Sequence, residues 1–265
     1  MKLIARIFKI LAMSLLVVVS PFQLVQANEV KVEVSNFFAD GGLALTLAWT
    51  GFHDGTFDPF NSGVNASTTV QALAKNGDMS GIRANFATTS CGINGAVFGP
   101  EGFTGTPVIE LGEITAAFFD INNIGSRYFS FLSMLRPTND AFIGNENPDQ
   151  YSLFDMLGNF VGLDILVLGS RVWDAGTKAN IGFDSPFLAG ANAQGRQGEN
   201  ATISKHSGGQ VLAGGLSIIS GTTPLEYTID ELAANFTAAG CQITRIKITQ
   251  VAKVSDPAVD MLTVL

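Results

Sequence analysis

Apolar and polar residues alternate with a period of two along several short segments, and this pattern predicts an all-β protein. Residues 30–38 place valines on one face and charged or polar residues on the other, as in an edge or half-buried strand. Residues 128–135 are almost continuously apolar, which is typical of a fully buried strand. Further strands are expected at residues 43–50, 108–118, 163–168, 211–219 and 243–251. Because strands and helices do not alternate regularly, we predict an antiparallel β-sandwich.

Two segments instead have the period of a helix. In residues 65–78, apolar side chains recur at i, i+3 and i+4, and Gly77 supplies a left-handed stop. Residues 228–240 begin with a capping-box pattern and end at Gly240. Residues 82–107 are rich in Gly and Thr and low in charge, so we expect a long loop or weak strands there. The sandwich is therefore predicted to carry one or two short helices.

The N-terminus has the layout of a secretory signal peptide. Three basic residues precede an apolar run at residues 10–19, and small residues lead up to a cleavage site after Ala27. The alternative, an uncleaved anchor, is disfavoured because a spanning helix needs about 20 apolar residues. We therefore expect a signal peptide at residues 1–27, one domain at residues 28–252 and a tail at residues 253–265. The mature chain is expected to be secreted or periplasmic, with no transmembrane segment.

Charge and cysteine content narrow the partners and the covalent chemistry. Without residues 1–27, the chain has 12 basic and 23 acidic residues, a net charge of −11. An acidic protein repels phosphate backbones, so nucleic acid is not expected as a partner. The two cysteines, Cys91 and Cys241, predict one disulfide in an exported protein. The alternative is a pair of buried free thiols.

Few residues suggest catalysis, and two suggest a cation. Asp140 and Asp174 each follow an apolar strand, and loops at one end of a sandwich can supply the oxygen ligands of a hard cation. An Asp in this position is also ordinary turn chemistry. His53 and Asp54 are adjacent, but the chain has no G-x-S-x-G elbow and no H-E-x-x-H zinc motif. We therefore predict a protein that is not an enzyme. The alternatives are an exported glycan-binding or hydrolytic protein that uses His53, and a structural component of an extracellular assembly.

Three segments carry a resemblance to a known family. They are residues 57–78, which end in LAKNGD, residues 130–144 (SFLSMLRPTNDAFIG) and residues 173–180 (WDAGTKAN). Together they resemble the spondin domain, which occurs in F-spondin, in mindin and in exported bacterial proteins. The resemblance implies a C2-like β-sandwich with calcium bound in loops at one end. In the animal members the domain serves matrix and cell-surface adhesion.

The resemblance places the three metal carboxylates of the family at Asp140, Asp174 and Lys178. A lysine cannot ligate a cation, so two alternatives stay open. In one, Asn180, Asp184 or backbone carbonyls complete a calcium site. In the other, the Lys178 amine replaces the ion and bridges the two aspartates as a salt bridge. On this basis we predict a secreted, non-enzymatic binding or adhesion domain whose partner is an unknown protein or surface ligand.

Overall fold

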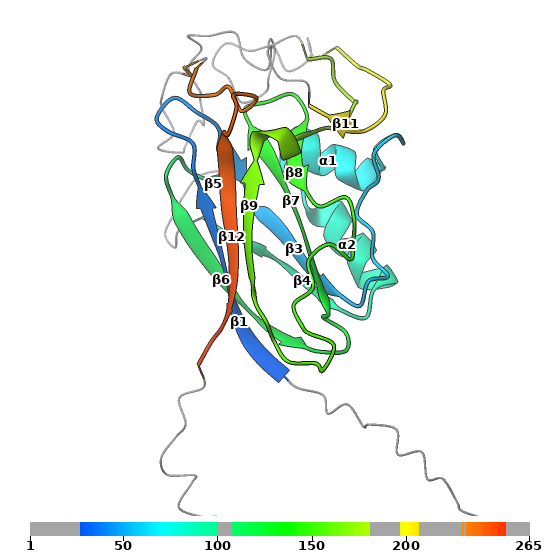
Figure 1. Ribbon diagram of the computed structural model, residues 1–265. Coiled ribbons are helices and arrows are strands. Elements are labelled where there is room, and N and C mark those ends of the chain that lie inside the picture. The colour runs from blue at the N-terminus through cyan, green and yellow to red at the C-terminus, as the bar shows by residue number, and fades with distance from the viewer. Residues whose placement is uncertain (1–26, 100–107, 181–196, 207–228, 231, 253–265) are drawn as a thin grey trace, which may run out of the picture.

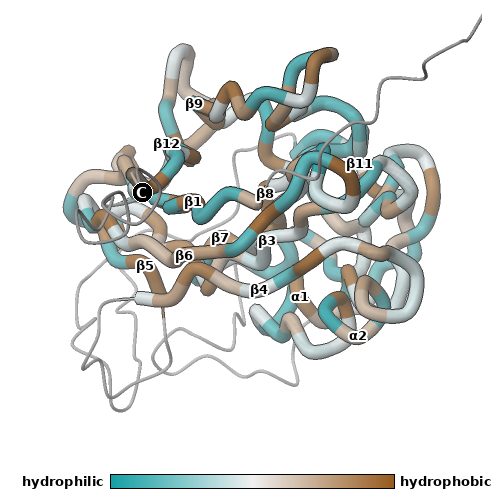
Figure 2. The backbone as a smooth tube through the Cα atoms, turned by 90° about the horizontal axis from the view of Figure 1, so that it is seen from below, coloured by the Kyte–Doolittle hydropathy of each residue, from teal (hydrophilic) through white to brown (hydrophobic). Residues whose placement is uncertain are grey.

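Two antiparallel β-sheets pack face to face, and two helices cover the outer face of one sheet (Figures 1 and 2). The computed structural model describes residues 27–99, 108–180, 197–206, 229–230 and 232–252. Residues 1–26 of the predicted signal peptide, the predicted strand at residues 211–219 and the predicted tail lie outside the described residues. The predicted all-β antiparallel sandwich with short helices is confirmed.

The first sheet has the strand order β6-β1-β12-β9. Its strands are β1 (Ala27–Asn36), β6 (Ile114–Asn122), β9 (Leu163–Leu168) and β12 (Gln242–Gln250). In β1, Val30, Val32 and Val34 are at most 1 % exposed, as their alternation with polar residues predicts. Since β1 pairs with both β6 and β12, it is a half-buried strand inside the sheet and not an edge strand.

The second sheet has the order β11-β10-β8-β7-β2-β5, and β3 joins it between β7 and β4. Its strands are β2 (Ala44–Thr46), β3 (Ala48–His53), β4 (Ile93–Val97), β5 (Val108–Ile109), β7 (Tyr128–Arg136), β8 (Ala141–Gly144), β10 (Trp173–Asp174) and β11 (Ser204–Lys205). Strand β7 is buried along almost its whole length. One of its faces packs against the first sheet and the other against the helices, which explains its continuous apolar sequence.

The helices α1 (Thr68–Asn76) and α2 (Ser80–Thr89) close a second apolar cluster on the outer face of the second sheet. The predicted helix at residues 65–78 is confirmed as α1. Its N-cap is Ser67, whose Oγ accepts a hydrogen bond from the Val70 N–H at 3.3 Å. Gly77 ends the helix at φ 69°, a left-handed conformation that glycine adopts without a steric penalty.

Two predictions from local pattern are wrong. Residues 82–107 were expected to be loop or weak strand, but this region contains most of α2 and the whole of β4. Only Ile82 and Phe86 are buried in α2, so the helical period is faint in the sequence. Residues 228–240 were expected to form a helix, yet their described part consists of turns. The Asp230 carboxylate accepts hydrogen bonds from two backbone N–H groups that follow it, which favours a turn over a helix.

The structure contradicts the predicted disulfide, because Cys91 and Cys241 are both free thiols. Cys91 lies beside Gly125, in the turn that follows β6. Cys241 directly precedes β12, whose first residues pair with the end of β1, and this end of β1 pairs with the start of β6. The two cysteines therefore lie at opposite ends of β6, roughly 25 Å apart at the usual rise per residue. A disulfide requires Cα atoms within about 7 Å.

The loops of interest lie at the end of the sandwich opposite the outer ends of β1 and β12 (Figure 1). The β7–β8 connection carries Asp140 there, and the 3-10 helix η1 (Gly169–Arg171) leads into β10 and Asp174. Strand β10 pairs with β8, which places Asp174 opposite Ala141. In the part of the chain that the structure describes, no helix is long and apolar enough to cross a membrane.

Candidate functional site

The Asp140 carboxylate lies at the centre of the first candidate site. One of its oxygens, Oδ2, accepts hydrogen bonds from the Thr177 N–H at 2.8 Å, the Thr177 hydroxyl at 2.7 Å and the Lys178 N–H at 2.8 Å. The loop that carries Asp174 thus folds around the side chain of Asp140. The site brings the two strongest segments of the spondin resemblance into contact.

The other carboxylate oxygen of Asp140, Oδ1, is buried and has no hydrogen-bond partner among the described residues. Burial raises the pKa of Asp140, and the nearby Asp174 charge raises it further, while the Thr177 and Lys178 donors act in the opposite direction. A buried carboxylate oxygen without a donor is costly. A cation at this position would offset that cost.

Asp174 is half-buried beside Asp140. Its Oδ1 accepts the Gly176 N–H at 2.7 Å, and its Oδ2 accepts a short hydrogen bond from the Asn180 side-chain amide. The Ala175 N–H donates to the Asp140 carbonyl at 3.2 Å, which links the two loops through the backbone. The structure therefore brings the predicted residues Asp140 and Asp174 together. Asn180 contacts Asp174, whereas Asp184 lies outside the described residues.

Lys178 enters the site through its backbone. Its N–H donates to Asp140, and the residue forms an isolated bridge with Gly198. The ion pairs between described residues are Lys31–Glu33 and Arg245–Asp164, so no described ion pair joins Lys178 to either aspartate. Within the described ranges, no group of three His, Cys, Asp or Glu side chains is arranged to hold a metal. The site thus offers two carboxylates, and its other oxygens would come from carbonyls, amides and water.

His53, the residue on which the hydrolytic alternative depends, is fully buried. Its Nδ1 accepts the Gly55 N–H at 3.1 Å, and its Nε2 lies 2.9 Å from the Ser130 hydroxyl. Because Nδ1 is an acceptor, the neutral ring carries its proton on Nε2. Burial lowers the pKa of His53, although the charges of Asp54 and Asp149 act to raise it. His53 is placed as a core residue that joins β3 to β7.

We expect His53 to stay neutral in the folded protein well below pH 6.5. Since its folded pKa is depressed, the unfolded chain binds the proton more readily, and His53 lowers stability as the pH falls below 6.5. An NMR titration of the imidazole resonances should give a midpoint below that of the same histidine in urea-unfolded protein. A folded-state midpoint at or above 6.5, or a proton on Nδ1, would contradict this assignment.

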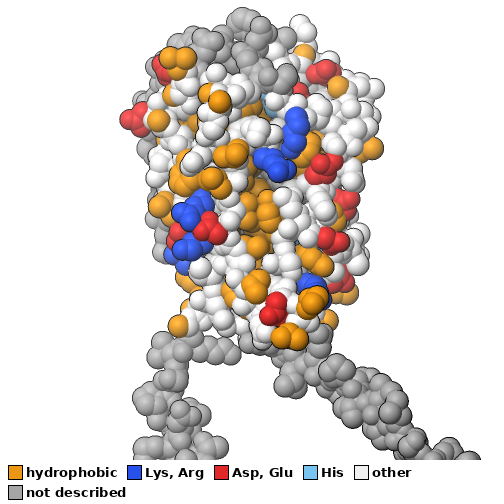
Figure 3. Space-filling model, viewed as in Figure 1, with side chains coloured by type: hydrophobic (Ala, Val, Ile, Leu, Met, Phe, Trp, Pro, Cys, Tyr) orange, Lys and Arg blue, Asp and Glu red, His pale blue; other side chains and the backbone are white. Residues whose placement is uncertain are grey.

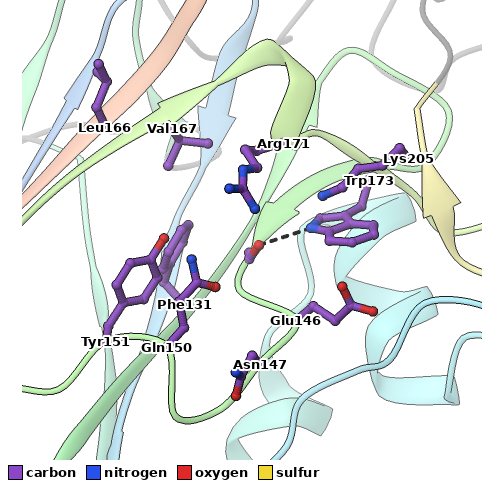
Figure 4. Close-up of a pocket in the computed structure, with 11 residues that line it drawn as sticks. Phe131, Glu146, Asn147, Gln150, Tyr151, Leu166, Val167, Arg171, Trp173 and Lys205 are labelled. Atoms are coloured by element: carbon purple, nitrogen blue, oxygen red, sulfur yellow. Dashed lines mark hydrogen bonds between the residues drawn. The ribbon is translucent and has the colours of Figure 1, made fainter.

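A second candidate site is a cavity of about 340 Å³ where the two sheets part beside β9 (Figure 4). Its apolar wall is formed by Phe131 of β7, Tyr151, and Leu166 and Val167 of β9. Trp173 closes one side, and its indole N–H donates to the Gly144 carbonyl at 3.0 Å. Figure 3 shows basic side chains beside a strip of hydrophobic side chains on this face of the molecule.

Two cations and one carboxylate line this cavity. Arg171 and Lys205 are exposed, and the Lys205 ammonium lies 2.9 Å from the centroid of the Trp173 ring. Burial lowers the pKa of Lys205 to about 8, the Arg171 charge contributes to this shift, and Glu146 opposes it. Glu146 accepts hydrogen bonds from the Ser62 N–H at 3.0 Å and from the Ser62 hydroxyl. The cavity therefore has a net positive charge in an otherwise acidic protein.

Sequence reasoning missed this cavity. Arg171 and Trp173 stand two positions apart just before Asp174, and that spacing places their side chains on one face of an extended segment. This signal was available in the sequence. Nothing in the sequence links them to Lys205 or Glu146, because β11 and the segment after β8 have no periodic pattern.

No protein-family model matches this chain, and no curated protein matches its sequence. The resemblance to the spondin domain therefore depends on the three sequence segments.

Proposed function

We propose that this chain is an exported, non-enzymatic binding domain that resembles the spondin domain and holds a calcium ion between the loops of Asp140 and Asp174. The observation that carries the proposal is the buried Asp140 Oδ1, which has no described donor and lies beside a second carboxylate. A hard cation is the natural partner of such an oxygen. With the loops fixed by the ion, this end of the sandwich would present a surface for adhesion to a protein or another surface ligand.

The binding function is favoured over the hydrolytic alternative because His53 has neither exposure nor a spare ring nitrogen. A general base must reach the proton that it abstracts. The glycan-binding and structural alternatives differ from the proposal in the partner that they name, and a calcium-dependent loop end is compatible with either. Calcium binding is thus the part of the proposal that an experiment on the isolated protein tests.

Calcium is expected to raise the melting temperature. Two carboxylates and a neighbouring lysine indicate a weak site, with a Kd of about 0.1–1 mM, as in other extracellular modules. At 10 mM calcium such a site stabilises the fold by about 2 kcal/mol, which corresponds to roughly 3–6 °C for a domain of this size. The measurement is a thermal melt in calcium chloride and in EDTA at matched ionic strength.

The variant Asp174→Asn should lose most of this calcium response. Asp164→Asn is the matched control, because Asp164 is exposed and pairs with Arg245 on the first sheet, away from the loops. It should keep the full response. If the wild-type protein melts at the same temperature in calcium and in EDTA, the calcium part of the proposal is wrong.

A further inference from the structure

We propose that the cavity beside β9 binds a small organic carboxylate with a compact apolar body. Its carboxylate would lie between Arg171 and Lys205, and its apolar part would lie against Phe131, Tyr151 and Val167. This inference goes beyond the proposed calcium site and does not depend on it. The volume of about 340 Å³ is in the range of small-molecule sites.

The cationic half of the cavity has the chemistry of an anion site. In the described part of the chain, no carboxylate lies within salt-bridge distance of Arg171 or Lys205. The one acidic side chain in the lining, Glu146, is oriented by two hydrogen bonds from Ser62. Figure 4 shows Arg171, Tyr151 and Gln150 directed toward the same space. A planar carboxylate matches the fork of a guanidinium, and its charge would relieve the repulsion between the two cations.

The other half of the cavity selects an apolar body. Phe131 is 2 % and Val167 is 4 % exposed, so both present buried apolar surface to the cavity. The Tyr151 ring packs on Phe131 with centroids 6.2 Å apart and extends this wall. The Trp173 ring is covered by the Lys205 ammonium and is 4 % exposed. Because that ring offers no open face for a sugar to stack on, the cavity suits a compact apolar acid better than a saccharide.

Phenylacetate is a suitable probe, with phenylacetamide as its neutral counterpart and acetate as a control without the apolar body. Binding is followed by NMR at pH 7 through the indole N–H of Trp173. Trp49, the second of the two tryptophans, lies in the apolar cluster under the helices and serves as an internal control. Phenylacetate should shift the Trp173 signal in a saturable way and leave Trp49 unchanged. Acetate and phenylacetamide should bind at least about tenfold more weakly, since each lacks one half of the interaction.

Arg171→Met should weaken phenylacetate binding about tenfold or more, because it removes a charge-assisted hydrogen bond. Arg171 is exposed, so this variant should fold, and its thermal melt checks that it does. Arg245→Met is the matched control, because Arg245 is an exposed arginine paired with Asp164 on the first sheet. It should bind phenylacetate as the wild type does.

The pH dependence of binding tests the role of Lys205. Lys205 has a pKa of about 8, whereas a free carboxylic acid is ionised throughout pH 7–9. Three other groups near Lys205 or in the lining keep their charge state in this range, because the pKa values of Glu146 and His206 are lowered and that of Tyr151 is raised. Arg171 also stays charged. Affinity should therefore fall about tenfold from pH 7 to pH 9 as Lys205 loses its proton, and Lys205→Arg should remove most of this fall.

Three results would overturn the proposal. The first is the absence of saturable phenylacetate binding below about 10 mM, which is weaker than a specific small-molecule site requires. The second is equal binding of phenylacetate and phenylacetamide. The third is an affinity that Arg171→Met and Arg245→Met reduce to the same extent. None of these results depends on calcium, so the titrations are run in EDTA and are independent of the calcium test.

Discussion

Replacing Trp173 with alanine is expected to lower the free energy of unfolding by about 3–5 kcal/mol, the usual cost of deleting a buried aromatic side chain. Trp173 is 4 % exposed, and its ring meets Phe60 edge to face with centroids 5.3 Å apart. It also anchors β10, which has only two residues and joins β11 to the rest of the second sheet. Urea unfolding followed by circular dichroism measures the change.

Trp173→Phe is the matched variant. It keeps an aromatic ring but loses the indole donor to the Gly144 carbonyl, so its expected cost is about 1–2 kcal/mol. Both variants also alter the cavity next to Lys205. If Trp173→Ala unfolded within 1 kcal/mol of the wild type, a threshold set by ordinary surface substitutions, the packing described for β10 would be wrong.

Asp140→Ala is expected to cost about 3 kcal/mol. The substitution leaves three donors, the N–H and hydroxyl of Thr177 and the N–H of Lys178, without their common acceptor. Each lost hydrogen bond to a charged group contributes roughly 1.5–3 kcal/mol, but water can reach these half-buried donors and reduces the total. Urea unfolding in EDTA isolates this effect from any contribution of calcium.

Asp140→Asn should behave differently in EDTA. Its amide oxygen can accept the same three hydrogen bonds, and its NH₂ group would take the place of the Oδ1 that has no described donor. The substitution also removes a buried charge. We therefore expect stability within about 1 kcal/mol of the wild type, as for a substitution that preserves its hydrogen bonds. Equal losses for the alanine and asparagine variants would contradict the geometry of the site.

The sign of the pH effect at Asp140 follows from its raised pKa. The folded state binds this proton more readily than the unfolded chain, so the contribution of Asp140 to stability falls as the pH rises from its ordinary pKa of 3.8 through the folded value. Asp140→Asn should remove this component from the pH profile.

The elements that were predicted from the sequence are those whose local pattern agrees with their burial. β1 alternates because one face of the first sheet faces the core, and α1 has both a cap at Ser67 and a stop at Gly77. α2 was missed because only two of its side chains are buried. The segment around Asp230 was misjudged because the same Asp and Asn side chains that cap helices also stabilise turns.

The candidate sites divide in the same way. Asp140 and Asp174 were found because each follows a recognisable strand, and the pairing of β8 with β10 brings them together. The disulfide was wrong because the presence of two cysteines says nothing about their distance, which the topology of the first sheet determines. The cavity was missed because Arg171, Glu146 and Lys205 come from three irregular connections that meet only in the folded chain.

The most direct test of the proposed function is a calorimetric titration of calcium into the wild-type protein and Asp140→Asn. The wild type should bind one calcium ion per chain with a Kd of about 0.1–1 mM. Asp140→Asn, folded and close to wild type in stability, should show no saturable heat over the same range. Binding of equal strength to both proteins, or to neither, would contradict a calcium ion held at Asp140.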